Sequence, residues 1–485
     1  MQRHLAPTRL AALVGDFDRA PAWLGLQRTL QELIGDGRIP IGTRLPSERA
    51  VTTALGVSRS TVARAYAELV DAGFASARQG SGTYATVPVE RRRALDHALH
   101  ADGPQADGDI DLNCAAGSAT PGVAAAYQRA LDALPSYLCG SGYLPSGLPE
   151  LQAIIAAWYG RRGLPTTPEQ VIVTSGALSA IAIVARALSR RGDRIMLESP
   201  VYSNAIEALR LGGAQLASAP LADPLGDTGW DIDEIEATLQ QAAPRLAYLI
   251  PDFQNPTGFL MGDTLRARYA DALRTAGTMP VVDETLQPTS LLDAPMPAPF
   301  AAHATDALTI GSASKMYWGG VRLGWIRAPR ALVAQLVATR VQFDLGSSLF
   351  DQLVLAELFK AGDDIHDIRR ARLRSRRDAL AGALREHLPD WRFRLPDGGL
   401  ALWVQLPRGS ATQLATDMQR HGVYLAPGPV FSVDGGSDGW LRIPFARNED
   451  ELVEAVRRIA AAWPASRDGT ITPPARTPTP GLMIA

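Results

Sequence analysis

The chain has 485 residues, of which 46% are hydrophobic and 20% charged, with a formal net charge of -2. These values are typical of a globular protein of two or three domains. Its two cysteines, Cys114 and Cys139, are too few for a disulfide framework, and we find neither a signal-peptide pattern nor an apolar run of about 20 residues, so we expect a cytoplasmic protein without a membrane segment.

The first 93 residues are basic. They contain 13 arginines and 8 acidic residues, which gives +5 for this head and -7 for the remainder. A basic head on an acidic body favours a polyanion as the partner of the head.

Helical signals follow a predicted N-terminal tail at residues 1–19. The apolar spacing of residues 23–34 predicts one helix. Ser47 begins a second short helix, Gly56 ends it in a tight turn, and Ser58 is the predicted N-cap of a third.

Two helices joined by a short glycine-containing turn make a helix-turn-helix, whose second helix can lie in the major groove of DNA. The next stretch, "GFASARQGSGTYAT", turns at Gly80 and Gly82 as a two-stranded wing would, and Arg78 on it suits a phosphate or the minor groove. The alternative is a helical subdomain with a solvated arginine face. We predict a winged helix-turn-helix DNA-binding domain over residues 20–86.

This head resembles the winged helix of the GntR family of regulators. The shared motifs are "LPSER", "SRSTV", "AYAEL" and "GSGT". The resemblance implies sequence-specific binding to double-stranded promoter or operator DNA. The contacts that it implies are Arg44, Arg49, Ser58, Arg59, Thr61, Arg64, Arg78 and Gly80.

A polar linker at residues 87–110 precedes a body over residues 111–465, in which short apolar runs alternate with helical patterns. Five of the apolar runs predict strands, namely "VIVT", "RIMLES", "LAYLI", "MPVV" and "LTI". Such alternation predicts an α/β fold with a mostly parallel sheet, whose ligands lie at the carboxyl ends of the strands. Residues 466–485, rich in Pro and Thr, are predicted to be a disordered tail.

Chemically distinctive residues follow those strands. Ser175, Gly176 and Ala177 open a helix and suit a phosphate, because backbone amides and the helix dipole point at this spot. Asn255 lies in a turn, Asp283 ends a strand, and the next strand is followed by a lysine.

That lysine, Lys315, is one of only two in the chain, the other being Lys360. Unlike arginine, a lysine amine can lose its proton and condense with carbonyls. A phosphate site, a hydrogen-bond donor, a carboxylate and an amine are together the set that holds pyridoxal phosphate as a Schiff base. Arg322 can reach back to the phosphate, and Tyr202 can stack on the ring.

The body resembles the fold-type I aminotransferases through "SGA", "NPTG", "DE" and "SASKMYWGGVRLGW". The resemblance implies that Lys315 forms the internal aldimine, Asp283 pairs the pyridine nitrogen and Asn255 bonds the phenolic oxygen. It implies that the phosphate is held by Ser175, Gly176, Ala177, Ser312 and Arg322. It also implies that Arg442 grips a substrate carboxylate, and that Tyr143 reaches the phosphate of the neighbouring subunit. No metal ion is expected.

Two positions depart from the family pattern. Leu286 stands where a tyrosine commonly bonds the phenolic oxygen of the cofactor, and Leu178 stands where a glutamine often follows "SGA". The first departure puts efficient transamination in doubt, whereas cofactor binding does not depend on it.

A GntR-type head on an aminotransferase-like body resembles the MocR-type regulators, which include the GabR kind. This resemblance implies a head-to-tail homodimer that controls transcription by sensing pyridoxal phosphate, an amino compound, or both, through an aldimine at Lys315. The alternatives are a working aminotransferase with a DNA-binding appendage and a scaffold without cofactor. The effector, the operator, and the choice between activation and repression stay open.

Overall fold

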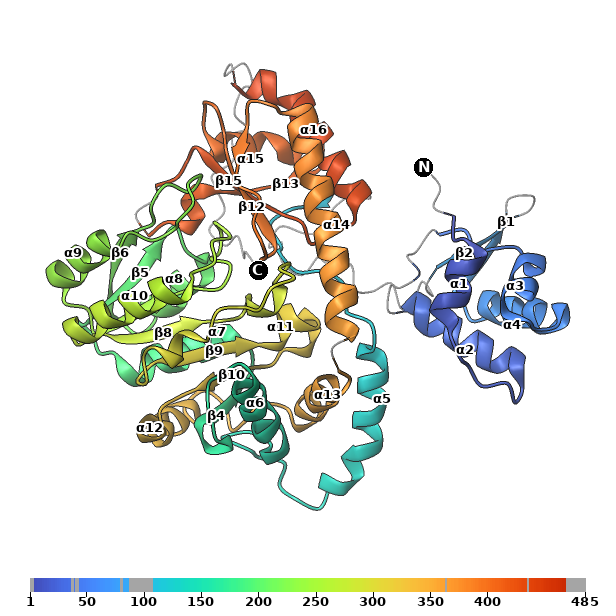
Figure 1. The fold of residues 1–485 in the computed structure, drawn as a ribbon, viewed down its shortest axis with the longest axis horizontal. Helices are drawn as coiled ribbons and strands as arrows, with labels where there is room; N and C mark the ends of the chain where they lie inside the picture. Colours follow the sequence, from blue (N-terminus) through green and yellow to red (C-terminus); the bar gives the residue numbers. More distant parts are fainter. Residues whose placement is uncertain are drawn as a thin grey trace. The chain divides into compact units, whose positions relative to one another are not determined.

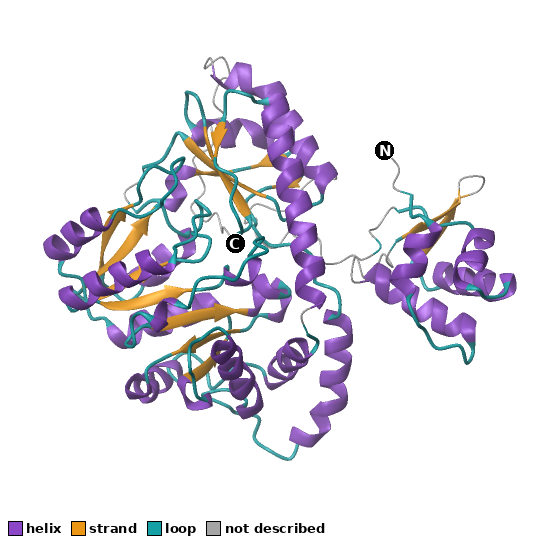
Figure 2. Cartoon of the chain, viewed as in Figure 1, coloured by secondary structure: helices purple, strands orange, loops and turns teal. Residues whose placement is uncertain are grey.

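The computed structural model describes residues 4–35, 39, 43–78, 82–86, 108–362, 364–433 and 436–467. The chain divides into two compact units, a head that groups residues 1–98 with 118–129 and a body that groups residues 99–117 with 130–485. Figures 1 and 2 show the helices and strands of both units. Four sequence predictions fall wholly or partly outside the described residues, namely residues 87–107 of the linker predicted at 87–110, residues 468–485 of the tail predicted at 466–485, Gly80 and the side chain of Arg78.

Up to residue 86, the described part of the head consists of helices followed by a two-stranded antiparallel wing. Ser47 caps the helix α3 by accepting the amide of Ala50, and Ser58 caps α4 by accepting the amide of Thr61 at 3.0 Å. Gly56 ends α3 with a left-handed φ of 64°, which glycine adopts at little cost. The predicted helix-turn-helix and wing are therefore confirmed. The elements are α1 (Pro7–Val14), α2 (Ala22–Gly35), α3 (Glu48–Leu55), α4 (Arg59–Asp71), β1 (Ala75–Arg78) and β2 (Gly82–Ala85).

The core of the head takes apolar side chains from each of these helices. Val51 of α3 and Val62 of α4 are fully buried, and Leu10 of α1 joins them. Leu10 and Val14 are four residues apart and so face the same side of α1. Residues 7–14, inside the predicted N-terminal tail, thus contribute to the core of the head.

The body is built on a sheet of seven described strands. All neighbours run parallel except β10, which is antiparallel to both strands beside it. The predicted mostly parallel sheet is confirmed, and every strand expected from an apolar run is present. The strand order is β4 (Val171–Thr174), β10 (Gly324–Arg327), β9 (Leu308–Ser312), β8 (Met279–Asp283), β7 (Leu246–Leu249), β5 (Arg194–Ser199) and β6 (Gln215–Pro220).

Helices cover both faces of this sheet. Ile326 of β10 packs in one cluster with α7 (Ala177–Leu188), α8 (Ser203–Arg210) and α12 (Arg330–Arg340). The neighbouring Trp325 points to the other face, since strand side chains alternate, and its Nε1 donates to Tyr159 of α6 (Pro149–Arg161) at 3.1 Å. Within the described ranges, no helix is long and apolar enough to cross a membrane.

A smaller C-terminal subdomain adds a second sheet to the body (Figure 2). Its antiparallel strands pack against two long helices and α15 (Ala411–Met418) in one apolar cluster. The long helices are α14 (Asp364–His387) and α16 (Glu449–Arg467). The strand order is β11 (Arg392–Phe393), β12 (Ala401–Gln405), β15 (Trp440–Pro444) and β14 (Ala426–Pro427), while β3 (Ile110–Asp111) pairs with β13 (Val423–Tyr424).

Candidate cofactor site and DNA-binding surface

The predicted cofactor residues gather at one edge of the large sheet. Because β10 runs opposite to both β4 and β9, those two strands end at the same edge, together with β7 and β8. Ser175 follows β4, Asp283 ends β8 and Ser312 ends β9. Lys315 comes next, in the short helix α11 (Ala313–Met316). The sheet topology thus brings together residues that are up to 140 positions apart in the chain.

Lys315 has the environment of a reactive amine. Its Nζ donates to the carbonyl of Ala115 at 3.2 Å. Burial lowers the pKa of Lys315 to about 8; the sulfur of Cys114 opposes this shift, and three nearby guanidinium groups add to it. By contrast, Lys360 pairs with Glu150 at 2.7 Å and with a second glutamate, and these carboxylates raise its pKa. Of the two lysines, only Lys315 is prepared to act as a neutral nucleophile.

Asp283 is a buried carboxylate held by two donors. Tyr248 donates its hydroxyl to Oδ2 at 2.5 Å, and the amide of Thr285 donates to Oδ1 at 2.8 Å. Burial raises the pKa of Asp283, although these bonds oppose the shift. The parallel register aligns Tyr248 with Val281, so Asp283, two residues on, shares a face with the tyrosine. Sequence reasoning missed Tyr248, because its contact depends on this register.

The start of α7 forms an anion cradle. Gly176 has a φ of 104°, and a Cβ atom built on it would lie 3.1 Å from Nη2 of Arg322. Arg322 itself has a left-handed φ of 51°, which is uncommon for a residue with a side chain and occurs mainly where function requires it. Ala177 begins the twelve-residue α7, and Ser312 caps α11 by accepting the amide of Ser314 at 3.1 Å. Open amides and an exposed guanidinium fit a phosphate group.

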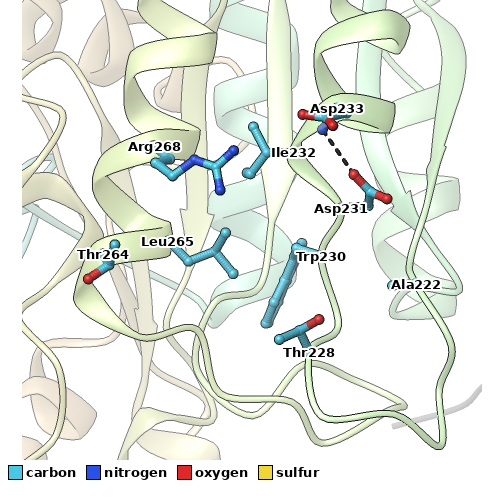
Figure 3. Close-up of a pocket in the computed structure, with 9 residues that line it drawn as sticks. All are labelled: Ala222, Thr228, Trp230, Asp231, Ile232, Asp233, Thr264, Leu265 and Arg268. Atoms are coloured by element: carbon cyan, nitrogen blue, oxygen red, sulfur yellow. Dashed lines mark hydrogen bonds between the residues drawn. The ribbon is translucent and has the colours of Figure 1, made fainter.

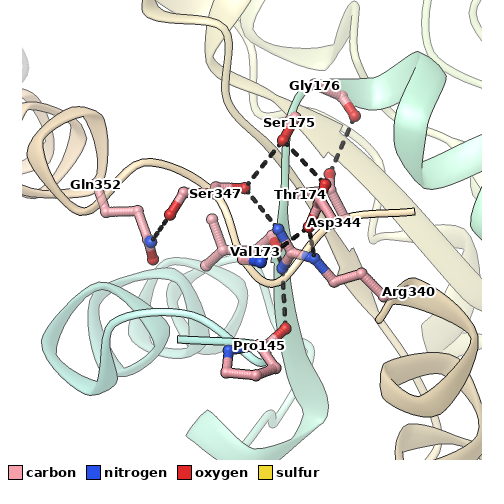
Figure 4. Close-up of polar contacts among 10 residues, drawn as sticks. Pro145, Val173, Thr174, Ser175, Gly176, Arg340, Asp344, Ser347 and Gln352 are labelled. Atoms are coloured by element: carbon pink, nitrogen blue, oxygen red, sulfur yellow. Dashed lines mark hydrogen bonds and ion pairs between the residues drawn. The ribbon is translucent and has the colours of Figure 1, made fainter. Parts of the chain in front are cut away.

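A buried arginine supports this cradle from below (Figure 4). Arg340 is fully buried and donates to Ser347 Oγ at 2.8 Å, Asp344 Oδ1 at 2.8 Å and the carbonyl of Pro145 at 2.9 Å. The Oγ of Ser175 lies 3.4 Å from both Asp344 Oδ2 and Ser347 Oγ. Sequence reasoning missed Arg340, because its contact with Pro145 joins segments 195 positions apart.

Arg442 on β15 is a buried cation of the body. It is fully buried, its Nη2 donates to the carbonyl of Asn113, and its guanidinium lies 4.9 Å from the ring centre of Phe431. Among the described residues, its Nε and Nη1 have no hydrogen-bond partner. Burial lowers its pKa to about 10. Two unpartnered donors on a buried cation fit the carboxylate of a ligand.

Arg442 and Lys315 contact the same short segment. Arg442 bonds the carbonyl of Asn113, and Lys315 bonds the carbonyl of Ala115. The amine and the guanidinium therefore bond the carbonyls of the two residues that flank Cys114 in the chain. No member of residues 113–115 was predicted as a site residue.

The other predicted site residues have varied positions. The hydroxyl of Tyr202 accepts from Asn204 at 3.0 Å, and burial raises its pKa. Asn255 lies in the turn after β7 and is partly buried. Tyr143 is 64% exposed, as a residue that reaches a neighbouring subunit would be. Leu286 is buried in the apolar cluster of the subdomain and offers no side-chain donor where the family has a tyrosine.

A separate cavity of about 420 Å³ lies between the loop before α9 (Ile232–Ala242) and the start of α10 (Asp263–Ala276) (Figure 3). None of the predicted site residues lines it. One of its walls is Trp230, whose Nε1 donates to buried Glu198 at 2.6 Å. Across the described chain, no group of three or more His, Cys, Asp or Glu side chains could hold a metal ion.

On the head, the predicted DNA contacts include the exposed cap of α4. Ser58 caps the helix by accepting the amide of Thr61, and the hydroxyl oxygens of these two residues are 2.8 Å apart. The side chains of Arg59 and Arg64 are 80% and 58% exposed. Arg59 lies 3.8 Å from Glu48, and such a pair between exposed charges is weak. These two arginines are therefore available to DNA.

The other two described candidates lie beside the helix-turn-helix. The backbone of Arg44 bridges to Tyr84 of the wing, and its guanidinium lies against Gly82. Arg49 lies in the first turn of α3, with its carbonyl bonded by Thr53.

Comparison with known proteins agrees with both units. The model of "Bacterial regulatory proteins, gntR family" matches residues 25–85, and the model of "Aminotransferase class I and II" matches residues 125–459. The chain belongs to the class I and II aminotransferase family and carries a GntR head. Pyridoxal phosphate is the cofactor of this fold, and the amine, the carboxylate and the anion cradle described above fit it.

This MocR-type chain is 29% identical to "Probable rhizopine catabolism regulatory protein MocR" of Rhizobium meliloti over 86% of its length and 88% of that protein's. It is 32% identical to "2-aminoadipate transaminase" of Thermus thermophilus over 66% of its length and 81% of the transaminase. The solved structure of LysN from Thermus thermophilus, an alpha-aminoadipate aminotransferase complexed with N-(5'-phosphopyridoxyl)-L-leucine, is 29% identical, with a TM-score of 0.67 over 74% of this chain and 93% of that one. The MocR-type chain is thus a DNA-binding regulator fused to an aminotransferase-like domain.

Proposed function

We propose that this regulator senses pyridoxal phosphate, an amino compound, or both at Lys315, and that DNA binding by the head responds. The observation that carries the proposal is Arg442. A fully buried guanidinium with two donors lacking a partner in the described residues is costly, and a carboxylate would satisfy both. That guanidinium and the amine of Lys315, whose pKa is lowered, both donate hydrogen bonds to carbonyls of the segment 113–115.

Each residue of the site has a binding task in this proposal. Pyridoxal phosphate supplies an aldehyde that condenses reversibly with amines. Lys315 would hold that aldehyde, and Arg442 would hold the carboxylate of an amine that competes for it. The residues that orient the cofactor are Ser175, Gly176, Ala177, Tyr202, Asn255, Asp283, Ser312 and Arg322.

The response follows from differential affinity. A ligand shifts an equilibrium only when it binds one form more tightly than the other. Lys315 lies in α11, directly after a strand of the large sheet, whereas Arg442 lies on β15 of the C-terminal subdomain, so an amino acid bound to both favours the form in which they lie closer. We propose a head-to-tail homodimer in which Tyr143 of each chain contacts the phosphate in its neighbour. A change in the distance between the two bodies of the dimer would then change the spacing of the two DNA-binding heads.

Reductive trapping tests the chemistry. The full chain is incubated with pyridoxal phosphate, reduced with borohydride and mapped by peptide mass spectrometry. We expect the added mass at Lys315, none at Lys360, and protection when an amino acid is bound. An unmodified Lys315 at saturating cofactor would contradict the proposal. Amines that alter the visible absorbance of the protein are then tested for their effect on DNA affinity.

A second candidate function is transamination. The chain retains Lys315, Asp283 and Arg442, the minimum for that chemistry, and it is 32% identical to a transaminase. Repeated turnover of an amino acid with a keto acid would favour the enzyme. An amino acid that changes the absorbance once, without keto acid production, would favour the sensor. Leu286 and its apolar surroundings favour the second outcome.

A further inference from the structure

The long helix α14 carries a row of arginines that bind main-chain carbonyls on both sides of the amino acid site. In Figure 1 the helix runs from beside α11 up along the C-terminal subdomain. Its arginines fall into two groups by their partners: Arg369, Arg370 and Arg374 bond the segments at 288–293 and 315, whereas Arg376 and Arg377 bond the C-terminal subdomain.

The first group holds the lysine segment. The two terminal nitrogens of Arg369 donate to two different carbonyls, Nη1 to Pro288 at 2.8 Å and Nη2 to Lys315 itself. The next residue, Arg370, donates to the carbonyl of Leu292 at 3.0 Å. Arg369 is therefore bound to the backbone of the reactive lysine, whereas Arg370 is bound to the loop after β8 and to Asp367 of its own helix.

The second group holds the end of the strand that carries Arg442. Arg376 donates to the carbonyl of Ala446 at 2.8 Å and to Asn448 Oδ1 at 3.0 Å. Ala446 comes four residues after Arg442 in the chain. Arg377 donates to the carbonyl of Pro396 at 2.9 Å, in the same subdomain.

We propose that α14 couples the amine site to the carboxylate site, with Arg369 as the positioning residue that ties Lys315 to the helix and Arg376 as its counterpart for the Arg442 strand. The coupling deepens the sensor function proposed above and rests on it. An amino acid that draws Lys315 and Arg442 together must move both groups of contacts or bend α14. The helix thereby transmits the state of the site to the subdomain.

Arginine suits this position better than lysine. Its planar fork can donate to two carbonyls at once, whereas a lysine ammonium is a single point. Its charge also acts on the amine, because the guanidinium of Arg369 is one of the cations that lower the pKa of Lys315. Substitutions of Arg369 can therefore separate its positioning of Lys315 from the effect of its charge.

The test uses the full chain loaded with pyridoxal phosphate. Arg369→Ala removes both position and charge, Arg369→Lys keeps the charge alone, and Arg370→Ala is the matched control on the same helix. One readout is the pH dependence of the cofactor's absorbance. The other is the ratio of DNA affinities with and without an amine that acts on the wild type.

We expect Arg369→Ala to shift the spectral transition to higher pH and to bring the affinity ratio within about twofold of one, from a wild-type coupling on the order of 5- to 150-fold. Arg369→Lys should leave the transition unchanged and still lose the coupling. Arg370→Ala should change neither readout. A wild-type affinity ratio in Arg369→Ala would overturn the proposed coupling.

A different set of results is expected if the protein is not a sensor at all. In that case the wild type shows no amine-dependent DNA affinity, and the spectral transition of the variants alone decides whether Arg369 positions Lys315. An unchanged transition in Arg369→Ala would then exclude that role. Thermal unfolding of all variants separates these outcomes from a simple loss of folding.

Discussion

The head and the body use arginine in opposite ways. In the head, the side chains of Arg59 and Arg64 are 80% and 58% exposed, and their acidic neighbours lie 3.8 and 3.9 Å away. In the body, Arg442 is fully buried. Exposed charges attract phosphates at long range and are screened by salt, whereas buried charges bind through direct, desolvated contacts.

Specificity for a small molecule is expected to reside in the body. Burial lowers the pKa values of Lys315 and Arg442 to about 8 and about 10. The side chains of Arg59 and Arg64 are instead largely exposed, although the guanidinium of Arg64 also lies 3.8 Å from the ring centre of Trp23. Chemistry therefore belongs to the body and electrostatic docking to the head, and four predictions test this division.

The largest effect is expected at the two lysines. Lys315→Ala should abolish covalent capture of pyridoxal phosphate, because it removes the amine. Lys360→Ala should capture as the wild type does, since that ammonium is held in its charged form by two glutamates. Absorbance after gel filtration measures capture. Equal capture of pyridoxal phosphate by both variants would contradict the claim that Lys315, and not Lys360, is the reactive lysine.

Arg442→Gln should weaken amino acid binding by about 100-fold, or about 3 kcal/mol, because a charged donor pair is lost. Arg266 is the matched control. It is equally buried, but each of its three nitrogens donates a hydrogen bond, one to Asp252 at 2.6 Å and the other two to main-chain carbonyls. Arg266→Gln should lower thermal stability rather than alter affinity selectively. Spectral titration and thermal unfolding measure the two quantities.

Arg59→Ala should weaken DNA binding by about tenfold, within the roughly 1–3 kcal/mol expected of a base contact, and should leave cofactor capture unchanged. Arg330 of the body is a suitable control. Its side chain is 69% exposed and lies 3.8 Å from Glu169, much as Arg59 lies near Glu48. Arg330→Ala should not affect DNA affinity at fixed salt. A similar loss in both variants would indicate non-specific charge.

Cofactor capture should depend on pH as the pKa of Lys315 requires. The neutral amine reacts, and a pKa lowered to about 8 makes half of it neutral at that pH. Capture should therefore slow about fivefold between about pH 8 and pH 7 and level off above about pH 9. Stopped-flow absorbance measures the rate. A rate that keeps rising to about pH 10.5 would indicate an unperturbed lysine.

Local signals in the sequence identified much of the fold. Ser58 and Gly56 act through neighbours a few residues away, so the caps and the turn could be predicted. The strand ends predicted Ser175, Asp283 and Lys315 in the same way, because parallel strands share an edge.

Contacts between distant segments could not be predicted in this manner. Tyr248 reaches Asp283 through a strand register, and Arg369 reaches Lys315 from a helix 54 positions away. Arg340 likewise joins loops that the sequence does not relate. The chain has 46 arginines, and the sequence alone does not show which of them are buried. The fold is needed to distinguish the buried arginines from the exposed ones.

The most direct test joins the two units. Full-length protein is titrated onto the DNA upstream of its own gene at one fixed salt concentration, with and without pyridoxal phosphate and an active amine, in parallel with Lys315→Ala. We predict that affinity or footprint changes in the wild type and stays constant in the variant. A wild type that ignores both ligands, or a variant that responds equally, would contradict control of the head through Lys315.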